Sequence, residues 1–139
     1  MRTLKVNLDK KILSSHEIRI GQNIMDRVIL LIAKNHKASR YVIVTDSNVN
    51  RLYGQTLLAA MTQAGLKVSV MEIPAGESSK NMSTVMDITG RLLAEGADRG
   101  TLLVALGGGV VGDLTGFIAS VYMRSVPYIQ IPTTLVGQV

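Results

Sequence analysis

The chain has 139 residues, of which 47% are hydrophobic and 18% charged, a composition typical of one packed domain and not of a disordered chain. It contains no cysteine, which excludes disulfides and thiolate metal sites, and its apolar runs are far shorter than the roughly 20 residues that span a bilayer. The net charge is +5, and the positive charge is concentrated in residues 1–40. This basic region is expected to be a solvated face or to attract a phosphorylated substrate. Nucleic-acid binding is less favoured, because one Phe, four Tyr and no Trp leave few aromatic side chains on which bases could stack.

Residues 1–40 predict an antiparallel β-hairpin followed by a helix. Apolar residues alternate in two segments, 3–8 and 16–20, and the polar residues between them can turn the chain. Apolar residues then recur at the spacing of a helix. The inward stripe of this helix is expected to consist of Ile24, Met25, Val28, Ile29, Leu31 and Ile32.

Beyond residue 40, short apolar runs alternate with helical patterns, which is the order expected of a parallel sheet. The runs that predict strands are 41–45, 67–73, 101–106 and 127–131. The run at 101–106 shows no polar alternation, as in a central parallel strand covered on both faces. We therefore expect one α/β domain over residues 1–139, with a Rossmann-like parallel sheet flanked by helices and preceded by the hairpin.

Three helical patterns connect these strands. The first ends at Gly65, and its inward side is predicted to consist of Leu52, Leu57, Leu58, Met61 and Ala64. The second closes near Gly96, and its apolar stripe is predicted to consist of Met82, Val85, Met86, Thr89, Leu92 and Leu93. The third begins after three glycines and extends to about Met123.

In a sheet of this kind, ligands bind at the carboxyl ends of the strands. The loops that leave those ends are 46–48, 74–80, 107–113 and 132–134. Gly107, Gly108 and Gly109 lead from a buried strand into a helix, so the main chain can approach a ligand with no Cβ in the way. The free N–H groups and positive dipole end of that helix suit a diphosphate, although a tight turn without a ligand uses the same residues. The spacing is neither G-x-G-x-x-G nor that of a Walker loop.

Polar side chains in the other loops each have a binding and a structural interpretation. Asp46 can hold a ribose hydroxyl or cap the next helix. Glu77 and Lys80 can both face the crevice or form an exposed ion pair. The hydroxyls of Thr133 and Thr134 can bind a phosphate or an amide, or cap the chain that follows.

Four side chains remain to be placed. Asp113 lies one turn into the third helix, where it complements the dipole or accepts a hydrogen bond from a ligand hydroxyl. Arg124 lies near the end of that helix, a position favoured electrostatically and also suited to gripping phosphate. His16 and His36 are expected on the surface. Neither is expected to bind a metal, because no cluster of His, Asp and Glu has metal-ligand spacing.

Four motifs, in their order and spacing, resemble those of 3-dehydroquinate synthases. They are Pro74-x-Gly76-Glu77-x-x-Lys80, Gly107-Gly108-Gly109-Val110-x-Gly112-Asp113-x-x-Gly116-Phe117-x-Ala119, Tyr122-x-Arg124 and Ile131-Pro132-Thr133-Thr134-Leu135. The resemblance implies an NAD-binding domain that is followed, in the family, by a helical domain carrying zinc or cobalt. It also implies a homodimeric enzyme of the shikimate route to aromatic amino acids. That enzyme converts 3-deoxy-D-arabino-heptulosonate 7-phosphate to 3-dehydroquinate and releases phosphate.

The resemblance further implies which residues meet ligands. Arg124 would reach the substrate phosphate across the homodimer interface. The residues expected to contact NAD are Asp46, Asn48, Ala75, Gly76, Glu77, Ser78, Ser79, Lys80, Gly108, Gly109, Val110, Val111, Gly112, Asp113, Thr133 and Thr134.

Two departures from the family pattern bear on these expectations. Ser125 stands where the family has Gly, so a Cβ must be fitted into that turn. The chain also ends at Val139, before the family's Asp-Ser-Ser-Val-Gly-Gly-Lys segment and its metal-ligating glutamate and histidines. We therefore expect the front part of a larger enzyme, which lacks the metal ligands, binds NAD weakly by itself and has no turnover alone.

Three other functions remain open: a related sugar-phosphate cyclase, an iron-type or polyol dehydrogenase, and a non-catalytic nucleotide-binding module. A dehydrogenase accumulates NADH, whereas a cyclase releases phosphate with no net NADH. The Pro-x-Gly-Glu-x-x-Lys and Tyr-x-Arg motifs favour the cyclase. No secretory signal or membrane span is visible, so the sequence predicts a cytoplasmic protein.

Overall fold

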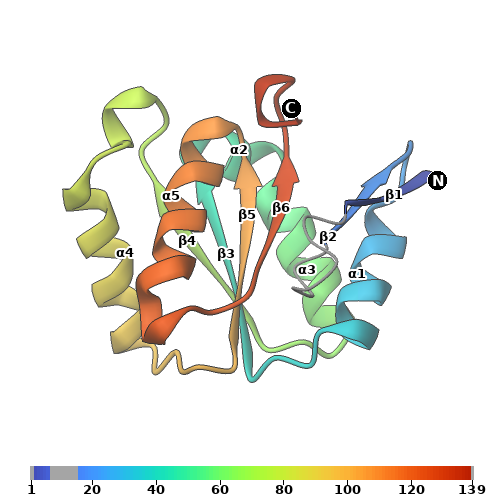
Figure 1. The fold of residues 1–139 in the computed structure, drawn as a ribbon, viewed down its shortest axis with the longest axis horizontal. Helices are drawn as coiled ribbons and strands as arrows, with labels where there is room; N and C mark the ends of the chain where they lie inside the picture. Colours follow the sequence, from blue (N-terminus) through green and yellow to red (C-terminus); the bar gives the residue numbers. More distant parts are fainter. Residues whose placement is uncertain (1, 7–15, 139) are drawn as a thin grey trace.

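The computed structural model describes residues 2–6 and 16–138. Its centre is a parallel sheet that lies between two layers of helices (Figure 1). The strands are β3 (Arg40–Asp46), β4 (Val68–Ile73), β5 (Thr101–Gly107) and β6 (Tyr128–Pro132). They are arranged in the order β4-β3-β5-β6 with every neighbouring pair parallel, which confirms the predicted Rossmann-like α/β fold.

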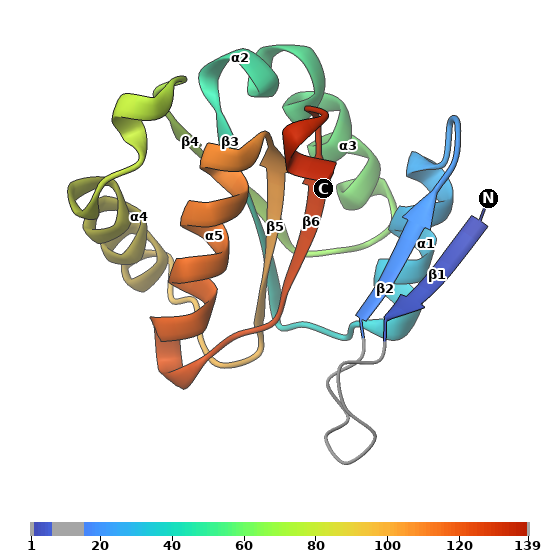
Figure 2. The same ribbon diagram turned by 45° about the horizontal axis from the view of Figure 1, so that its top comes forward.

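A separate antiparallel hairpin precedes the sheet and lies beside helix α1 (Figure 2). Strand β1 (Arg2–Val6) pairs with β2 (His16–Ile20), and Leu4 lies opposite Ile18. The predicted hairpin is confirmed for these strands, while the turn predicted between them lies outside the described residues. Leu4, Ile18 and Ile20 are exposed, so the hairpin does not contribute them to the core of the domain.

Strand β5 lies at the centre of the core, because all seven of its residues are buried. This confirms the prediction of a parallel strand covered on both faces. The helices are α1 (Met25–Asn35), α2 (Ser47–Val49), α3 (Gln55–Gln63), α4 (Met82–Ala94) and α5 (Gly109–Val121). One apolar cluster joins α4 and α5 to the sheet, and a second joins α1 and α3 to its other face. None of the helices within the described ranges is long and apolar enough to cross a membrane.

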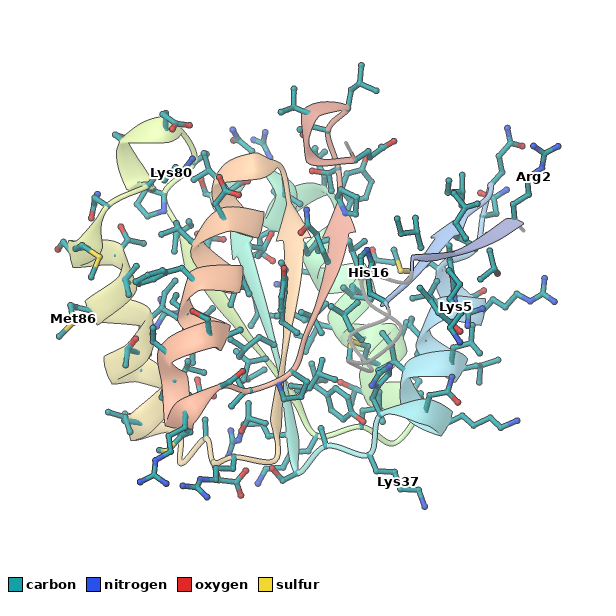
Figure 3. All side chains as sticks on the ribbon, in the orientation of Figure 1. Arg2, Lys5, His16, Lys37, Lys80 and Met86 are labelled. Carbon is teal, nitrogen blue, oxygen red and sulfur yellow. The ribbon has the colours of Figure 1, made fainter. Side chains whose placement is uncertain are left out.

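The buried side of α4 differs from the predicted stripe. The α4 side chains that are buried in the core are Val85, Ile88 and Leu92. The predicted residues Met82, Met86 and Leu93 are exposed instead, and Figure 3 shows Met86 pointing away from the sheet. At 3.6 residues per turn the two sets form neighbouring stripes about 100° apart, and only one stripe can face the sheet. Met25 is exposed as well, because it begins α1 one turn before the first buried residue of that helix.

A π-helical turn, η1 (Asn50–Gly54), leads into helix α3. Leu57 and Met61 are buried as predicted, since residues four apart share one side of a helix. Leu52 lies in the π turn, five residues before Leu57, and is 60% exposed. Ala64 is exposed because it lies beyond the last residue of α3, as its C-terminal cap. The predictions that these two residues face inward were therefore wrong.

Candidate functional site

The strand order creates a crevice at the carboxyl edge of the sheet. The chain passes from β3 to β4 on one side and then returns to place β5 on the other side of β3. Loops that leave β3 and β5 therefore diverge, and ligands bind in the gap between such loops. A cavity of about 330 Å³ lies there. Its lining residues are Asp46, Asn48, Val49, Ala75, Gly76, Gly108, Gly109, Val110, Val111, Thr133 and Thr134, so all four predicted loops meet in one place.

Helix α5 begins at this cavity without a side-chain cap. Its first internal hydrogen bond is donated by Gly112 N–H to the carbonyl of Gly108, at 3.0 Å. The N–H groups that precede this bond, and so have no partner inside the helix, are those of Gly109, Val110 and Val111. Helix α4, in contrast, is capped by the side chain of Asn81. The start of α5 therefore offers an anion several donors together with the positive end of a helix dipole.

An added Cβ would have different neighbours at each of the three glycines of this loop. A Cβ at Gly107 would lie 2.7 Å from Cβ of Val111, so the helix could not follow the strand so closely. A Cβ at Gly108 would lie 3.0 Å from Cγ2 of Thr134. A Cβ at Gly109 would meet no atom within 4 Å and would enter the cavity that this residue lines. Close packing and ligand access therefore both require glycine here.

Asp46 caps the next helix and also lines the cavity. Its Oδ1 accepts hydrogen bonds from the N–H groups of Asn48 (2.9 Å) and Val49 (3.0 Å), which confirms that it caps the next helix. Because one oxygen takes both bonds and the residue lines the cavity, its second oxygen is left for a ligand. Ser47 Oγ accepts a hydrogen bond from Ala75 N–H (3.2 Å) and ties this loop to the next. Neither Val49 nor Ser47 was among the predicted site residues, although both adjoin residues that were.

Lys80 and Asp113 form an ion pair beside the cavity. Lys80 Nζ lies 2.7 Å from Asp113 Oδ2 and 3.9 Å from Glu77 Oε1. The main partner of Lys80 is therefore Asp113 on α5 and not its neighbour in the loop. The hydrogen bond and the charge of Asp113, followed by the charge of Glu77, raise the pKa of Lys80 above its ordinary value of 10.5. The pair joins the loop after β4 to helix α5, one turn after the start of that helix.

Replacing Asp113 with Asn is expected to lower the pKa of Lys80 toward its ordinary value, because the largest causes of the shift are removed. The stabilising contribution of the pair is present below the ordinary lysine pKa and is lost as the pH rises through the raised folded-state value. An NMR titration of the lysine ε-carbons in both proteins measures the difference. Glu77→Gln should have a smaller effect, and an unchanged Lys80 pKa in the Asp113 variant would contradict the ion pair.

Several predicted residues lie outside the cavity lining. Ser79 is 5% exposed, and its Oγ donates to the carbonyl of Pro74 (2.5 Å), so this side chain shapes the loop. Gly112 packs against β6, since a Cβ there would lie 3.0 Å from Nε2 of Gln130. Ser78 is exposed and is not among the residues that line the cavity. NAD contacts by these residues remain predictions.

Arg124 lies at the opposite end of α5 from the cavity. The helix has 13 residues and is therefore about 20 Å long. Arg124 follows it in a short 3-10 segment, and the turn has three successive positive φ values, at Met123 (49°), Arg124 (69°) and Ser125 (88°). Within one chain, Arg124 and the cavity are thus separate. The expectation that Arg124 acts across a homodimer remains a prediction.

The φ of 88° and ψ of 126° at Ser125 fall in a region that favours glycine. Ser125→Gly is therefore expected to raise the free energy of unfolding by about 1 kcal/mol, because relieved backbone strain exceeds the entropy that glycine adds to the unfolded chain. Urea denaturation measures this change. Ser120→Gly, within helix α5, is the matched control and should lower stability by about 0.5–1 kcal/mol. A less stable Ser125→Gly protein would show that the turn is not strained.

The deciding comparison is with a family model described as 3-dehydroquinate synthase N-terminal, which matches residues 70–139, just over half of the chain. The chain belongs to this family. The matched residues include three of the four loops that line the cavity, among them the glycine loop. The 3-dehydroquinate synthase resemblance of the sequence is thus confirmed at the level of the family.

Solved structures of sugar-phosphate cyclases resemble this 3-dehydroquinate synthase family domain. One is a 2-deoxy-scyllo-inosose synthase that was solved with carbaglucose-6-phosphate, NAD+ and Co2+. It is 25% identical to this chain, with a TM-score of 0.86, and the match covers 98% of this chain and 36% of the synthase chain. ValA, a 2-epi-5-epi-valiolone synthase from Streptomyces hygroscopicus subsp. jinggangensis 5008, was solved with NAD+ and Zn2+. It is 37% identical with a TM-score of 0.68 over 80% of this chain and 31% of its own. The chain therefore spans about a third of the length of these relatives.

Glycerol dehydrogenase from Schizosaccharomyces pombe shares the fold of this 3-dehydroquinate synthase family domain. It is 20% identical with a TM-score of 0.60, over 79% of this chain and 26% of its own. The described part of the family domain contains no group of three or more His, Asp or Glu residues that could hold a metal ion. The uncapped helix and the glycine loop at the cavity suit an anionic group such as a diphosphate, whereas no group of His, Asp and Glu among the described residues could hold a divalent metal.

Proposed function

We propose that this chain is the NAD-binding part of a sugar-phosphate cyclase. One observation carries the proposal: the uncapped start of α5 opens into a cavity formed by all four strand-end loops. A dinucleotide needs donors for its diphosphate, which the start of α5 offers, and it binds in the crevice at the carboxyl edge of such a sheet. Two cyclases with a similar domain were solved with NAD+.

Each loop has a part in holding the cofactor. The diphosphate would accept hydrogen bonds from the N–H groups at the start of α5, while Thr133 and Thr134 offer hydroxyls at the end of β6. Asp46 would accept a hydrogen bond from a ribose hydroxyl. Lys80 and Asp113 would meet the part of the cofactor that leaves the cavity along α5. When bound, NAD supplies a reversible hydride acceptor, and these residues hold and orient it.

The reaction we assign is the conversion of 3-deoxy-D-arabino-heptulosonate 7-phosphate to 3-dehydroquinate, with release of phosphate. The four motifs that resemble 3-dehydroquinate synthases, and the family model that matches residues 70–139, support this assignment. The activity would also require a metal-binding domain with zinc or cobalt and a second subunit that supplies its Arg124 to the substrate phosphate. We place the enzyme in the cytoplasm. By itself, the 139-residue chain would bind NAD weakly and turn over no substrate.

Two measurements test the proposed function. Calorimetric titration of the purified chain with NAD should show weak, saturable binding, and no heat or chemical-shift change at millimolar NAD would contradict it. The full-length protein, incubated with the heptulosonate phosphate, should release phosphate and form 3-dehydroquinate with no net NADH. Accumulation of NADH from a polyol would support a dehydrogenase instead, and a different carbocycle would support another cyclase.

A further inference from the structure

The chain after β6 folds back over the start of α5. Thr133 N–H donates to the carbonyl of Gly107 at 2.9 Å, and Gly137 N–H donates to Oγ1 of Thr134 at 3.2 Å. A Cβ on Gly137 would lie 3.6 Å from the carbonyl carbon of Gly108. The folded-back residues therefore lie directly against the glycine loop, and Gly137 contacts Thr134, which lines the cavity.

Gln130, in the middle of β6, connects this segment to the sheet. Its Nε2 donates a hydrogen bond to the carbonyl of Gly137 at 3.1 Å. The same amide packs against α5, since a Cβ on Gly112 would lie 3.0 Å from Nε2 and 3.3 Å from Cδ. Gly112 therefore leaves the space that the glutamine amide occupies between the helix and the folded-back segment.

The alternation along β6 places Gln130 on the face of the sheet that α5 covers. Ile129 and Ile131 pack against the apolar cluster on the opposite face of the sheet. Gln130 alternates with them and so lies on the side of α5, where it is exposed beside the helix. The glutamine side chain is long enough for its amide to donate a hydrogen bond to the carbonyl of Gly137, and an apolar side chain has no donor for this bond.

We infer that Gln130 is a positioning residue for the diphosphate of the cofactor. It does not line the cavity. It acts through Gly137, whose N–H holds the Thr134 hydroxyl against the glycine loop beside the free N–H groups of α5. This role of Gln130 rests on the proposed function, because it concerns the start of α5, which is assigned to the diphosphate.

Gln130→Met removes the donor while keeping the length of the side chain, and it adds no charge near the diphosphate. In the full-length protein we expect the affinity for NAD and for ADP-ribose to fall about three- to tenfold, as for the loss of one hydrogen bond. The affinity for adenosine, measured by NMR titration, should not change. Gln63→Met, at the exposed end of α3, is the matched control and should bind all three ligands as the wild type does.

Four outcomes would overturn the role of Gln130. Unchanged affinity of Gln130→Met for NAD and ADP-ribose would do so while leaving the proposed function intact. If Gln130→Met weakened the binding of all three ligands equally, or if its thermal unfolding midpoint fell strongly, the substitution would have destabilised the domain as a whole. Failure of the wild-type protein to bind NAD at all would remove the proposed function and, with it, the role of Gln130.

Discussion

Replacing Gly108 with valine is expected to weaken NAD binding at least about a hundredfold. The new Cβ would lie 3.0 Å from Cγ2 and 3.2 Å from Oγ1 of Thr134, so the end of β6 must move away from the helix. The two added methyl groups would also occupy the space through which a diphosphate reaches the N–H groups of Gly109 and Val110. Losing two hydrogen bonds to a charged group, each worth roughly 1.5–3 kcal/mol, accounts for an effect of this size.

Calorimetric titration with NAD measures this effect, with circular dichroism to show that the variant is folded. Gly90→Val is the matched control, because Gly90 lies on the exposed side of α4 with no atom within 4 Å of its added Cβ. Gly109→Val provides an independent second variant, since its Cβ meets no protein atom yet enters the cavity. Wild-type affinity in both Gly108→Val and Gly109→Val would show that the diphosphate binds elsewhere.

Leu103→Ala is expected to lower the free energy of unfolding by about 2–5 kcal/mol, the usual cost of truncating a fully buried leucine. Leu103 is 0% exposed in the central strand β5, opposite Val42 of β3 and Tyr128 of β6. Its side chain belongs to the cluster that joins α4 and α5 to the sheet, so the surroundings can collapse only partly into the cavity left behind.

Urea denaturation of the wild type and the variant measures the cost. Leu93→Ala serves as the control, because Leu93 is 56% exposed on α4 and alanine is the better helix former. It should change stability by less than about 0.5 kcal/mol. If the two leucine variants lost similar stability, β5 would not be the centre of the core.

The sheet and the general location of the site could be predicted from the sequence, because both depend on local patterns. The apolar run at 101–106 has no alternation, and the structure buries it on both faces. The rule that ligands bind at the carboxyl ends of parallel strands then brought together four loops that are far apart in the chain. These loops line one cavity in the structure.

The details that were not predictable depend on contacts distant in the sequence. Helix α4 carries two apolar stripes, and only packing against the sheet determines that Ile88 is buried and Met86 exposed. The spacing of Glu77 and Lys80 suggested a local ion pair, but the tertiary fold brings Asp113 closer to Lys80. The π turn that precedes α3 has no periodic signal in the sequence, and it leaves Leu52 exposed.

The most direct test is a crystal structure of the full-length protein with ADP-ribose or NAD bound. The diphosphate should accept hydrogen bonds from the N–H groups of Gly109 and Val110 and lie beside Thr134, at the carboxyl edge of the sheet. A cofactor bound with its diphosphate away from the start of α5 would contradict the assignment of this cavity.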